Sequence, residues 1–160
     1  MDLGIKDKVA FITGASAGIG LSTAEAFVNE GAKVIICGRN QQKLKDAKNL
    51  ITKNTGKEVG AYTCDTSKFE QVEKTVNEII KEYKKIDILI NNAGKAQAGG
   101  VVDAKPEDWQ SMIDVKIYSL INTCKLIAPI MKKNKWGRIV NMSSIGGIYP
   151  NPKLTISHGL

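Results

Sequence analysis

A glycine-rich turn near the N-terminus constrains the fold more than any other stretch of this sequence. Residues 13–20 read Thr-Gly-Ala-Ser-Ala-Gly-Ile-Gly; they follow the apolar run Val9–Ile12 and lead into a segment with helical periodicity. This order predicts a strand, a tight loop and a helix. Because Gly14, Gly18 and Gly20 carry no side chain, a pyrophosphate can approach the free amides of the helix N-terminus closely.

The spacing of these glycines leaves a second interpretation open. It is G-x-x-x-G-x-G, which differs from the G-x-G-x-x-G form usual in dinucleotide sites. Glycines of either spacing also occur in plain connections between a strand and a helix. The strand before the turn and the helix after it are the context that phosphate binding needs, so the sequence favours a dinucleotide site.

Strand and helix patterns alternate along the rest of the chain. Further strands are predicted at Lys33–Cys37, Glu58–Tyr62, Ile86–Ile90 and Gly137–Ser144, and helices at Gln41–Lys53, Phe69–Tyr83 and from Pro106 onward, with a helical pattern starting again near Thr155. The segment Ile145–Pro152 is predicted to be loop. This alternation predicts one α/β domain over residues 1–160, a Rossmann-type, doubly wound parallel sheet in three α/β/α layers. Ligands of such sheets bind beyond the carboxyl ends of the strands.

Two residues at predicted strand ends bear on the choice of ligand. NAD sites place an acidic residue about 20 positions after the glycines, whereas an arginine there accommodates the 2′-phosphate of NADP. This chain has Arg39 and no acid, which favours NADP over NAD; the alternative is a loop arginine that faces water. Asp65 either caps the following helix or accepts a hydrogen bond from an adenine amino group. Ala93 and Gly94 leave room for a ribose and a ring.

Composition excludes several classes of protein. With 160 residues, 42% hydrophobic and 24% charged, the chain matches one ordinary domain, and a cytoplasmic location is expected because no apolar stretch is long enough for a membrane span or a signal peptide. The single His158 and three scattered cysteines argue against a metal site. The net charge of +7 comes with lysine runs near predicted helix ends, so no nucleic-acid partner is expected.

The segment that follows Pro106 carries more apolar side chains than one exposed helix face needs. They are Trp109, Ile113, Ile117, Leu120, Ile121, Cys124, Leu126 and Ile127. Burial against the sheet and against a second subunit would explain this excess. We therefore expect a homo-oligomer, a dimer or a tetramer.

Three motifs in this order resemble the short-chain dehydrogenase/reductase family, in particular 3-oxoacyl-[acyl-carrier-protein] reductases. They are the glycine turn at 13–20, Asn-Asn-Ala-Gly at 91–94 and the strand end Ser143-Ser144. The resemblance implies a reductase or dehydrogenase that uses NAD(P)(H) and acts on a small carbonyl or alcohol. It also implies where the cofactor lies: the pyrophosphate and ribose along the turn at Gly14, Ala15, Ser16, Gly18, Ile19 and Gly20, the adenine near Asp65 and Thr66, and the nicotinamide near Asn92, Ala93 and Gly94.

The catalytic residues of the family match only in part. The family uses Asn, Ser, Tyr and Lys, with the tyrosine as general acid and base. By resemblance, Ser144 is the serine that hydrogen-bonds the substrate oxygen, but Lys116 stands at the asparagine position and Ser157 near the tyrosine position. Tyr149 and Lys153 fit Y-x-x-x-K by letters, but the prolines at 150 and 152 are incompatible with the shared helix that this motif needs.

Three explanations remain for the missing tyrosine. It follows residue 160 after a longer loop, Ser157 or another acid replaces it, or the protein binds cofactor without catalysis. Lys116 would then partly compensate through its positive charge near the developing alkoxide. The family normally adds two more strands after this point, so the chain resembles a fragment whose C-terminal strands are missing, with an uncovered sheet edge. The leading hypothesis is an NADP(H)-dependent oxidoreductase, and the alternative is a binding protein that acts as a sensor or a subunit partner.

Overall fold

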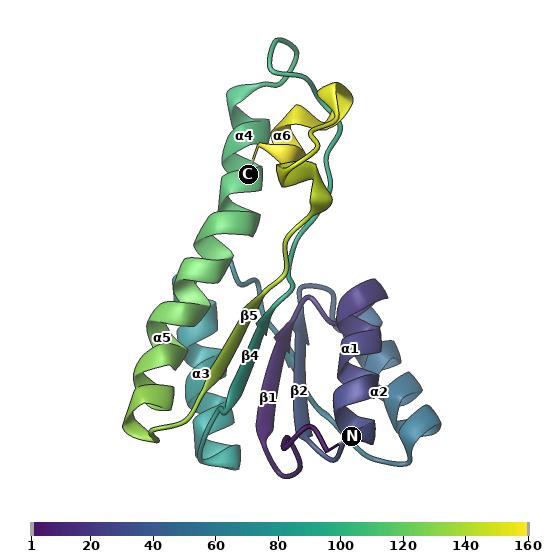
Figure 1. The fold of residues 1–160 in the computed structure, drawn as a ribbon, viewed down its shortest axis with the longest axis vertical. Coiled ribbons are helices and arrows are strands. Elements are labelled where there is room, and N and C mark those ends of the chain that lie inside the picture. Colours follow the sequence, from purple (N-terminus) through teal and green to yellow (C-terminus); the bar gives the residue numbers. More distant parts are fainter. Residues whose placement is uncertain (1, 160) are drawn as a thin grey trace.

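The computed structural model describes residues 2–159 and contains a parallel sheet with helices on both faces (Figure 1). The five strands are β1 (Val9–Thr13), β2 (Lys33–Gly38), β3 (Gly60–Thr63), β4 (Ile88–Asn91) and β5 (Arg138–Asn141), in the spatial order β3-β2-β1-β4-β5. The α-helices are α1 (Gly18–Asn29), α2 (Gln41–Thr55), α3 (Phe69–Tyr83), α4 (Pro106–Ile113), α5 (Ser119–Lys133) and α6 (Thr155–His158). The predicted Rossmann-type fold is confirmed.

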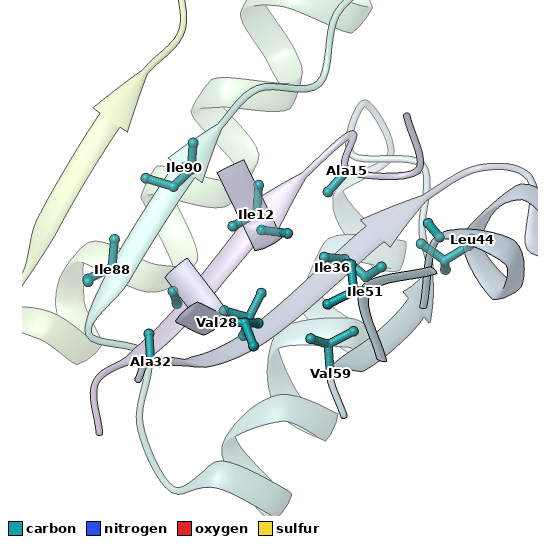
Figure 2. Packing of buried hydrophobic residues seen from close by; sticks show 14 residues of the cluster. Ile12, Ala15, Val28, Ala32, Ile36, Leu44, Ile51, Val59, Ile88 and Ile90 are labelled. Atoms are coloured by element: carbon teal, nitrogen blue, oxygen red, sulfur yellow. The ribbon is translucent and has the colours of Figure 1, made fainter. Parts of the chain in front are cut away.

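The central strand β1 divides its side chains between two hydrophobic cores. Successive residues of a strand point to opposite faces. Ala10 and Ile12 belong to the core under α1 and α2, whereas Val9 and Phe11 belong to the core under α3 and α5. Figure 2 shows the first of these cores, in which Ile12 lies among residues of the neighbouring strands. Because both faces are covered, the strand is apolar at nearly every position.

The order of the strands fixes where a ligand can bind. β1 pairs with β2 on one side and with β4 on the other, all in parallel, so the direction of winding reverses between β1 and β4. In sheets of this kind the loops that leave β1 and β4 diverge and open a crevice at the carboxyl ends of the strands. The glycine turn follows β1 and the motif at 91–94 follows β4, so both motifs lie at this crevice.

The structure differs from the sequence prediction in the extent of several elements. β3 and β5 are shorter than predicted, since only the residues that pair with β2 and β4 form ladder hydrogen bonds. The predicted long helix is divided by a π-helical segment, η1 (Asp114–Tyr118). The segment 145–152, predicted as loop, includes the 3₁₀ turn η2 (Ile145–Gly147) and the start of η3 (Pro152–Leu154), each begun by a side-chain cap. The predicted helix near Thr155 is present as α6.

Candidate cofactor and catalytic site

A cavity of about 330 Å³ lies at the carboxyl ends of β1, β2, β3 and β4. Its walls combine small residues of the turns with a few polar side chains. They are Gly14, Ser16, Ala17, Gly18, Gly38, Arg39, Cys64, Asp65, Thr66, Ala93, Gly94 and Val115. Eight of the twelve residues predicted to hold a cofactor line this cavity: Gly14, Ser16, Gly18, Arg39, Asp65, Thr66, Ala93 and Gly94.

The glycine turn has the backbone geometry of an anion cradle. Gly14 and Gly18 adopt left-handed conformations, with φ of +64° and +56°. A Cβ atom at Gly14 would lie 2.7 Å from the Cα of Ala93, so only glycine lets β1 and β4 approach here. A Cβ at Gly18 would point into open space, where a ligand has room. The first turn of α1 holds no acidic residue and Ala17 provides no side-chain cap, so its free amides face the cavity unopposed.

Thr13 connects the turn after β1 with the motif after β4. Its Oγ accepts hydrogen bonds from the amides of Asn92 and Ala93, each at 3.0 Å, and donates to the Ile90 carbonyl. The Asn92 side chain donates in turn to the carbonyls of Thr13 and Gly14. Thr13 belongs to the sequence motif, but the motif assigned it no role. A hydroxyl at the end of a buried apolar strand needs a hydrogen-bond partner, and this was the sequence signal for the role of Thr13.

Arg39 extends from the end of β2 along the wall of the cavity. It is exposed, and within residues 2–159 its guanidinium makes no hydrogen bond or ion pair. The next residue, Asn40, caps α2 by accepting a hydrogen bond from the Lys43 amide at 2.9 Å. Gly38 lies against Ser16, whose Oγ would be 3.3 Å from an added Cβ. This packing favours glycine, and sequence reasoning missed Gly38 as part of the wall.

Asp65 and Thr66 form the far wall, after β3. Asp65 is not the cap of α3; that position belongs to Lys68. One carboxylate oxygen of Asp65 accepts from the amide and the hydroxyl of Ser67, which leaves the other oxygen free of hydrogen bonds in the described chain. Thr66 is held by a 3.0 Å hydrogen bond from its hydroxyl to Ser119 of α5. The loop is thus fixed from outside while its inner edge faces the cavity.

Four of the predicted cofactor residues, Ala15, Ile19, Gly20 and Asn92, do not line the cavity. Ala15 is buried, and its amide donates to the Cys37 carbonyl rather than facing a ligand. Gly20 packs on Asn92, which leaves no room for a side chain there. Ile19 has a largely exposed side chain. The spacing of the motif could not distinguish these residues from those that line the cavity, because it does not show which backbone amides of the turn already have hydrogen-bond partners.

Two buried thiols lie next to the cavity wall, Cys37 in β2 and Cys64 directly after β3. Cys37 and Cys64 share the core under α3 and α5, as expected for small buried cysteines, and Cys64 also reaches the cavity wall. A hydrogen bond with Cys64, together with burial, raises the pKa of Cys37. The same hydrogen bond lowers the pKa of Cys64. Cys64 was not predicted as a wall residue, since only the pairing of β3 with β2 brings it there.

The three predicted catalytic residues lie on different elements. Ser144 caps η2 by accepting a hydrogen bond from the Gly146 amide at 3.1 Å. Lys116 lies in η1, directly after the cavity residue Val115, and its Nζ donates to the hydroxyl of Ser157 at 3.3 Å and to the Ser157 carbonyl. Burial lowers the pKa of Lys116. The helix α6, which carries Ser157, packs against both η2 and α4 (Figure 1).

Tyr149 and Lys153 do not form a helical pair. Tyr149 follows the 3₁₀ turn η2 with 74% of its side chain exposed, and Lys153 lies in the separate turn η3. Among residues 2–159, no group of three or more His, Cys, Asp or Glu side chains has a geometry that could hold a metal ion. No helix in that range is long and apolar enough to cross a membrane.

Comparison with known proteins identifies the family of this chain. The family model described as short chain dehydrogenase matches residues 8–156. The 3-oxoacyl-[acyl-carrier-protein] reductase FabG of Thermotoga maritima is 36% identical over 155 residues, which cover 94% of this chain and 61% of that protein. The structure of L-sorbose reductase from Gluconobacter frateurii, complexed with NADPH and L-sorbose, has a TM-score of 0.94 at 31% identity, over 99% of this chain and 60% of that one.

A third relative differs in its cofactor. The structure of NAD⁺-bound xylitol dehydrogenase has a TM-score of 0.91 at 29% identity, over 97% of this chain and 60% of that one. This chain therefore spans about three fifths of the length of these relatives. The family match covers the glycine turn, the motif after β4 and the pair Ser143-Ser144 that follows β5. From these motifs and the fold that joins them, we conclude that this chain belongs to the short-chain dehydrogenase family.

Proposed function

We propose that this protein is an NADP(H)-dependent oxidoreductase that transfers a hydride between the nicotinamide and a small carbonyl or secondary alcohol, with 3-oxoacyl thioesters as candidate substrates. The observation that carries the proposal is the cavity between the glycine turn and the motif at 91–94, with an unpaired arginine on its wall. The bound cofactor would supply the hydride. The residues of the chain would bind it, orient the substrate and deliver the proton.

The proposed contacts combine residues that line the cavity with residues that the family resemblance adds to them. The turn from Gly14 to Gly20 would hold the pyrophosphate on the amides of α1, and Asp65 and Thr66 would flank the adenine. Asn92, Ala93 and Gly94 would face the nicotinamide side, and the Ser144 hydroxyl would donate a hydrogen bond to the substrate oxygen. The Ser144 oxygen already accepts from Gly146, so the hydroxyl is free to donate.

Arg39 supports the preference for NADP(H). A guanidinium without a protein partner matches the geometry and the charge of a 2′-phosphate, and no acidic residue at the end of β2 competes for it. The relatives do not decide this point, because the sorbose reductase structure holds NADPH and the xylitol dehydrogenase structure holds NAD⁺. The preference is therefore a property to be tested on this chain.

The test compares binding of NADPH and NADH by calorimetry in wild type and two variants. Arg39→Ala should weaken NADPH binding roughly tenfold to hundredfold, the effect of losing charged hydrogen bonds, and leave NADH binding nearly unchanged. Arg138→Ala is the matched control, because the other arginine of the chain lies on β5 against Trp136 and away from the cavity. Equal affinity of the wild type for both nucleotides would contradict the assignment of Arg39.

A second candidate function is cofactor binding without turnover, as a sensor or as a subunit partner. It is favoured by one observation: a serine rather than a tyrosine stands at residue 157. NADPH oxidation against a panel of ketones and 3-oxoacyl thioesters separates the two functions. Turnover supports the oxidoreductase, whereas tight NADPH binding with no oxidation of any substrate supports the binding protein.

A further inference from the structure

Lys116 and Ser157 form a polar pair between elements that are distant in sequence. They are 41 residues apart, and the Nζ of Lys116 donates to the Ser157 hydroxyl at 3.3 Å and also to the Ser157 carbonyl. Lys116 lies in the π-helical segment η1, and Ser157 lies in α6. Both contacts join the same two residues, so the lysine fixes the position of the serine hydroxyl as well as that of its backbone.

The pair lies close to the other residues of the proposed site. Lys116 directly follows Val115, which lines the cavity, and π-helical turns inside α-helices occur frequently at functional sites. On the other side, α6 packs on η2, the turn that Ser144 begins. A Cβ at Gly146 of this turn would lie 2.5 Å from the His158 ring, which shows how closely the residue after Ser157 approaches it.

The direction of the hydrogen bond decides what the serine can do. The ammonium group of Lys116 can only donate, so the Ser157 oxygen accepts and its own proton remains available to a third group. Within the described residues this hydroxyl has no other hydrogen-bond partner. Ser157 is 6% exposed, and in such surroundings a donated ammonium hydrogen bond polarises a hydroxyl more strongly than in water. The lowered pKa of Lys116, caused by burial, makes its proton easier to release.

We propose that Ser157, polarised by Lys116, gives the proton to the substrate oxygen during carbonyl reduction; this inference rests on the proposed function. As the carbonyl carbon receives the hydride, the π electrons of the C=O bond move to the oxygen, which takes the Ser157 hydroxyl proton. Ser157 takes a proton from the Lys116 ammonium in exchange. The neutral amine then recovers a proton from water, so each turnover consumes one proton from solvent.

A purely structural role makes a different prediction. If Lys116 only holds α6 in place, its bond to the Ser157 carbonyl is sufficient and the hydroxyl is dispensable. Ser157→Ala removes the hydroxyl and keeps the carbonyl, whereas Ser157→Thr keeps both. Ser111→Ala is a matched control, because Ser111 on α4 also accepts a hydrogen bond from a lysine, Lys95, at 2.7 Å.

The experiment measures kcat, KM and the NADPH dissociation constant for these variants with a ketone that the wild type reduces. Ser157→Ala should lower kcat roughly 10²–10⁴-fold, the usual contribution of a positioned acid, with KM and NADPH binding little changed. Ser157→Thr, which keeps a hydroxyl, should recover most of the kcat that Ser157→Ala loses, and Ser111→Ala should keep kcat near that of the wild type. Retained kcat in Ser157→Ala would overturn the inference. If Ser157→Ala does not fold, Lys116→Met is the second test. Retained turnover in Lys116→Met would also overturn the inference.

Nitrogen-15 NMR of the cofactor-free protein provides a readout that does not depend on activity. The side-chain signal of Lys116 should shift in Ser157→Ala and stay in place in Ser157→Thr and Ser111→Ala. An unchanged signal in Ser157→Ala would show that the pair is not formed. A wild type that binds no NADPH, or that reduces none of the ketones, contradicts the proposed function and this inference together. Active wild type with fully active Ser157→Ala contradicts this inference alone.

Discussion

At the scale of single residues, Gly14 is constrained both by its backbone conformation and by a neighbouring backbone. Its φ of +64° is a left-handed conformation, and a Cβ would lie 2.7 Å from the Ala93 Cα. Gly56 has nearly the same conformation, with φ of +68°, but no atom within 4 Å of the added Cβ. The two glycines therefore separate the cost of backbone strain from the cost of a steric clash.

We expect Gly56→Ala to lower the free energy of unfolding by about 1–2 kcal/mol, the cost of a left-handed conformation for a residue with a Cβ. Gly14→Ala should lose roughly 1–3 kcal/mol more, because β1 and β4 must also move apart. Urea unfolding followed by circular dichroism measures both. Equal losses in the two variants would show that the contact between residues 14 and 93 imposes no constraint.

Residues within motifs were predictable from the sequence, and contacts between distant segments were not. The glycine turn and the motif at 91–94 place their residues at known ends of strands, so the cavity between them followed from the fold class alone. The hydrogen bonds of Lys116 to Ser157 depend on a π-helical turn and on the path of a loop between β5 and α6. Neither has a periodicity that can be detected in sequence.

At the scale of elements, the apolar excess predicted after Pro106 is divided by the structure into a buried and an exposed part. Of the eight residues predicted, Ile127 is buried, and Trp109, Ile113, Leu120, Cys124 and Leu126 are partly buried. Ile117, Tyr118 and Ile121 remain 39–48% exposed along η1 and the start of α5. The spacings of four and three residues to Ile121 place these side chains on one side of the helix. We propose this exposed face as the contact with a second subunit.

This face makes a prediction about the oligomeric state. Ile121→Glu should shift the protein toward monomer, because it places a charge in an apolar contact. Leu50→Glu is the control: Leu50 is 42% exposed on α2, close to the 45% of Ile121, but it lies on the opposite side of the sheet. Sedimentation velocity at several concentrations measures the shift. An identical response of both variants, or a wild type that is monomeric throughout, would contradict the proposed contact.

The extent of elements was less predictable than their existence. Buried parallel strands such as β1 are apolar throughout, and this pattern located them correctly. At the edge of the sheet the same pattern overestimated β5, which ends at Asn141; beyond it the Met142 amide still donates to the Asn91 carbonyl of β4, but Ser143 and Ser144 do not pair with that strand. Where a strand ends is decided by its neighbour, which the local sequence does not contain.

At the scale of the whole molecule, β5 is the least protected part of the sheet. It pairs with β4 on one side only, and all four of its residues are exposed, with Ile139 at 39% and Val140 at 45%. An exposed edge strand with apolar side chains presents unpaired backbone groups to other chains. The chain spans about three fifths of its relatives' length, and within residues 2–159 no further strand pairs with this edge.

We therefore expect the 160-residue polypeptide to self-associate through β5, in addition to any contact through α5. Val140→Lys should reduce light scattering on concentration, because charged side chains on an edge strand oppose pairing with another strand. The control is Val102→Lys: Val102 is 94% exposed but lies in a loop without a strand edge. If hydrophobic exposure alone drove association, Val102→Lys would have the larger effect. If the strand edge drives it, Val140→Lys suppresses scattering and Val102→Lys does not, and only this outcome is compatible with association through β5.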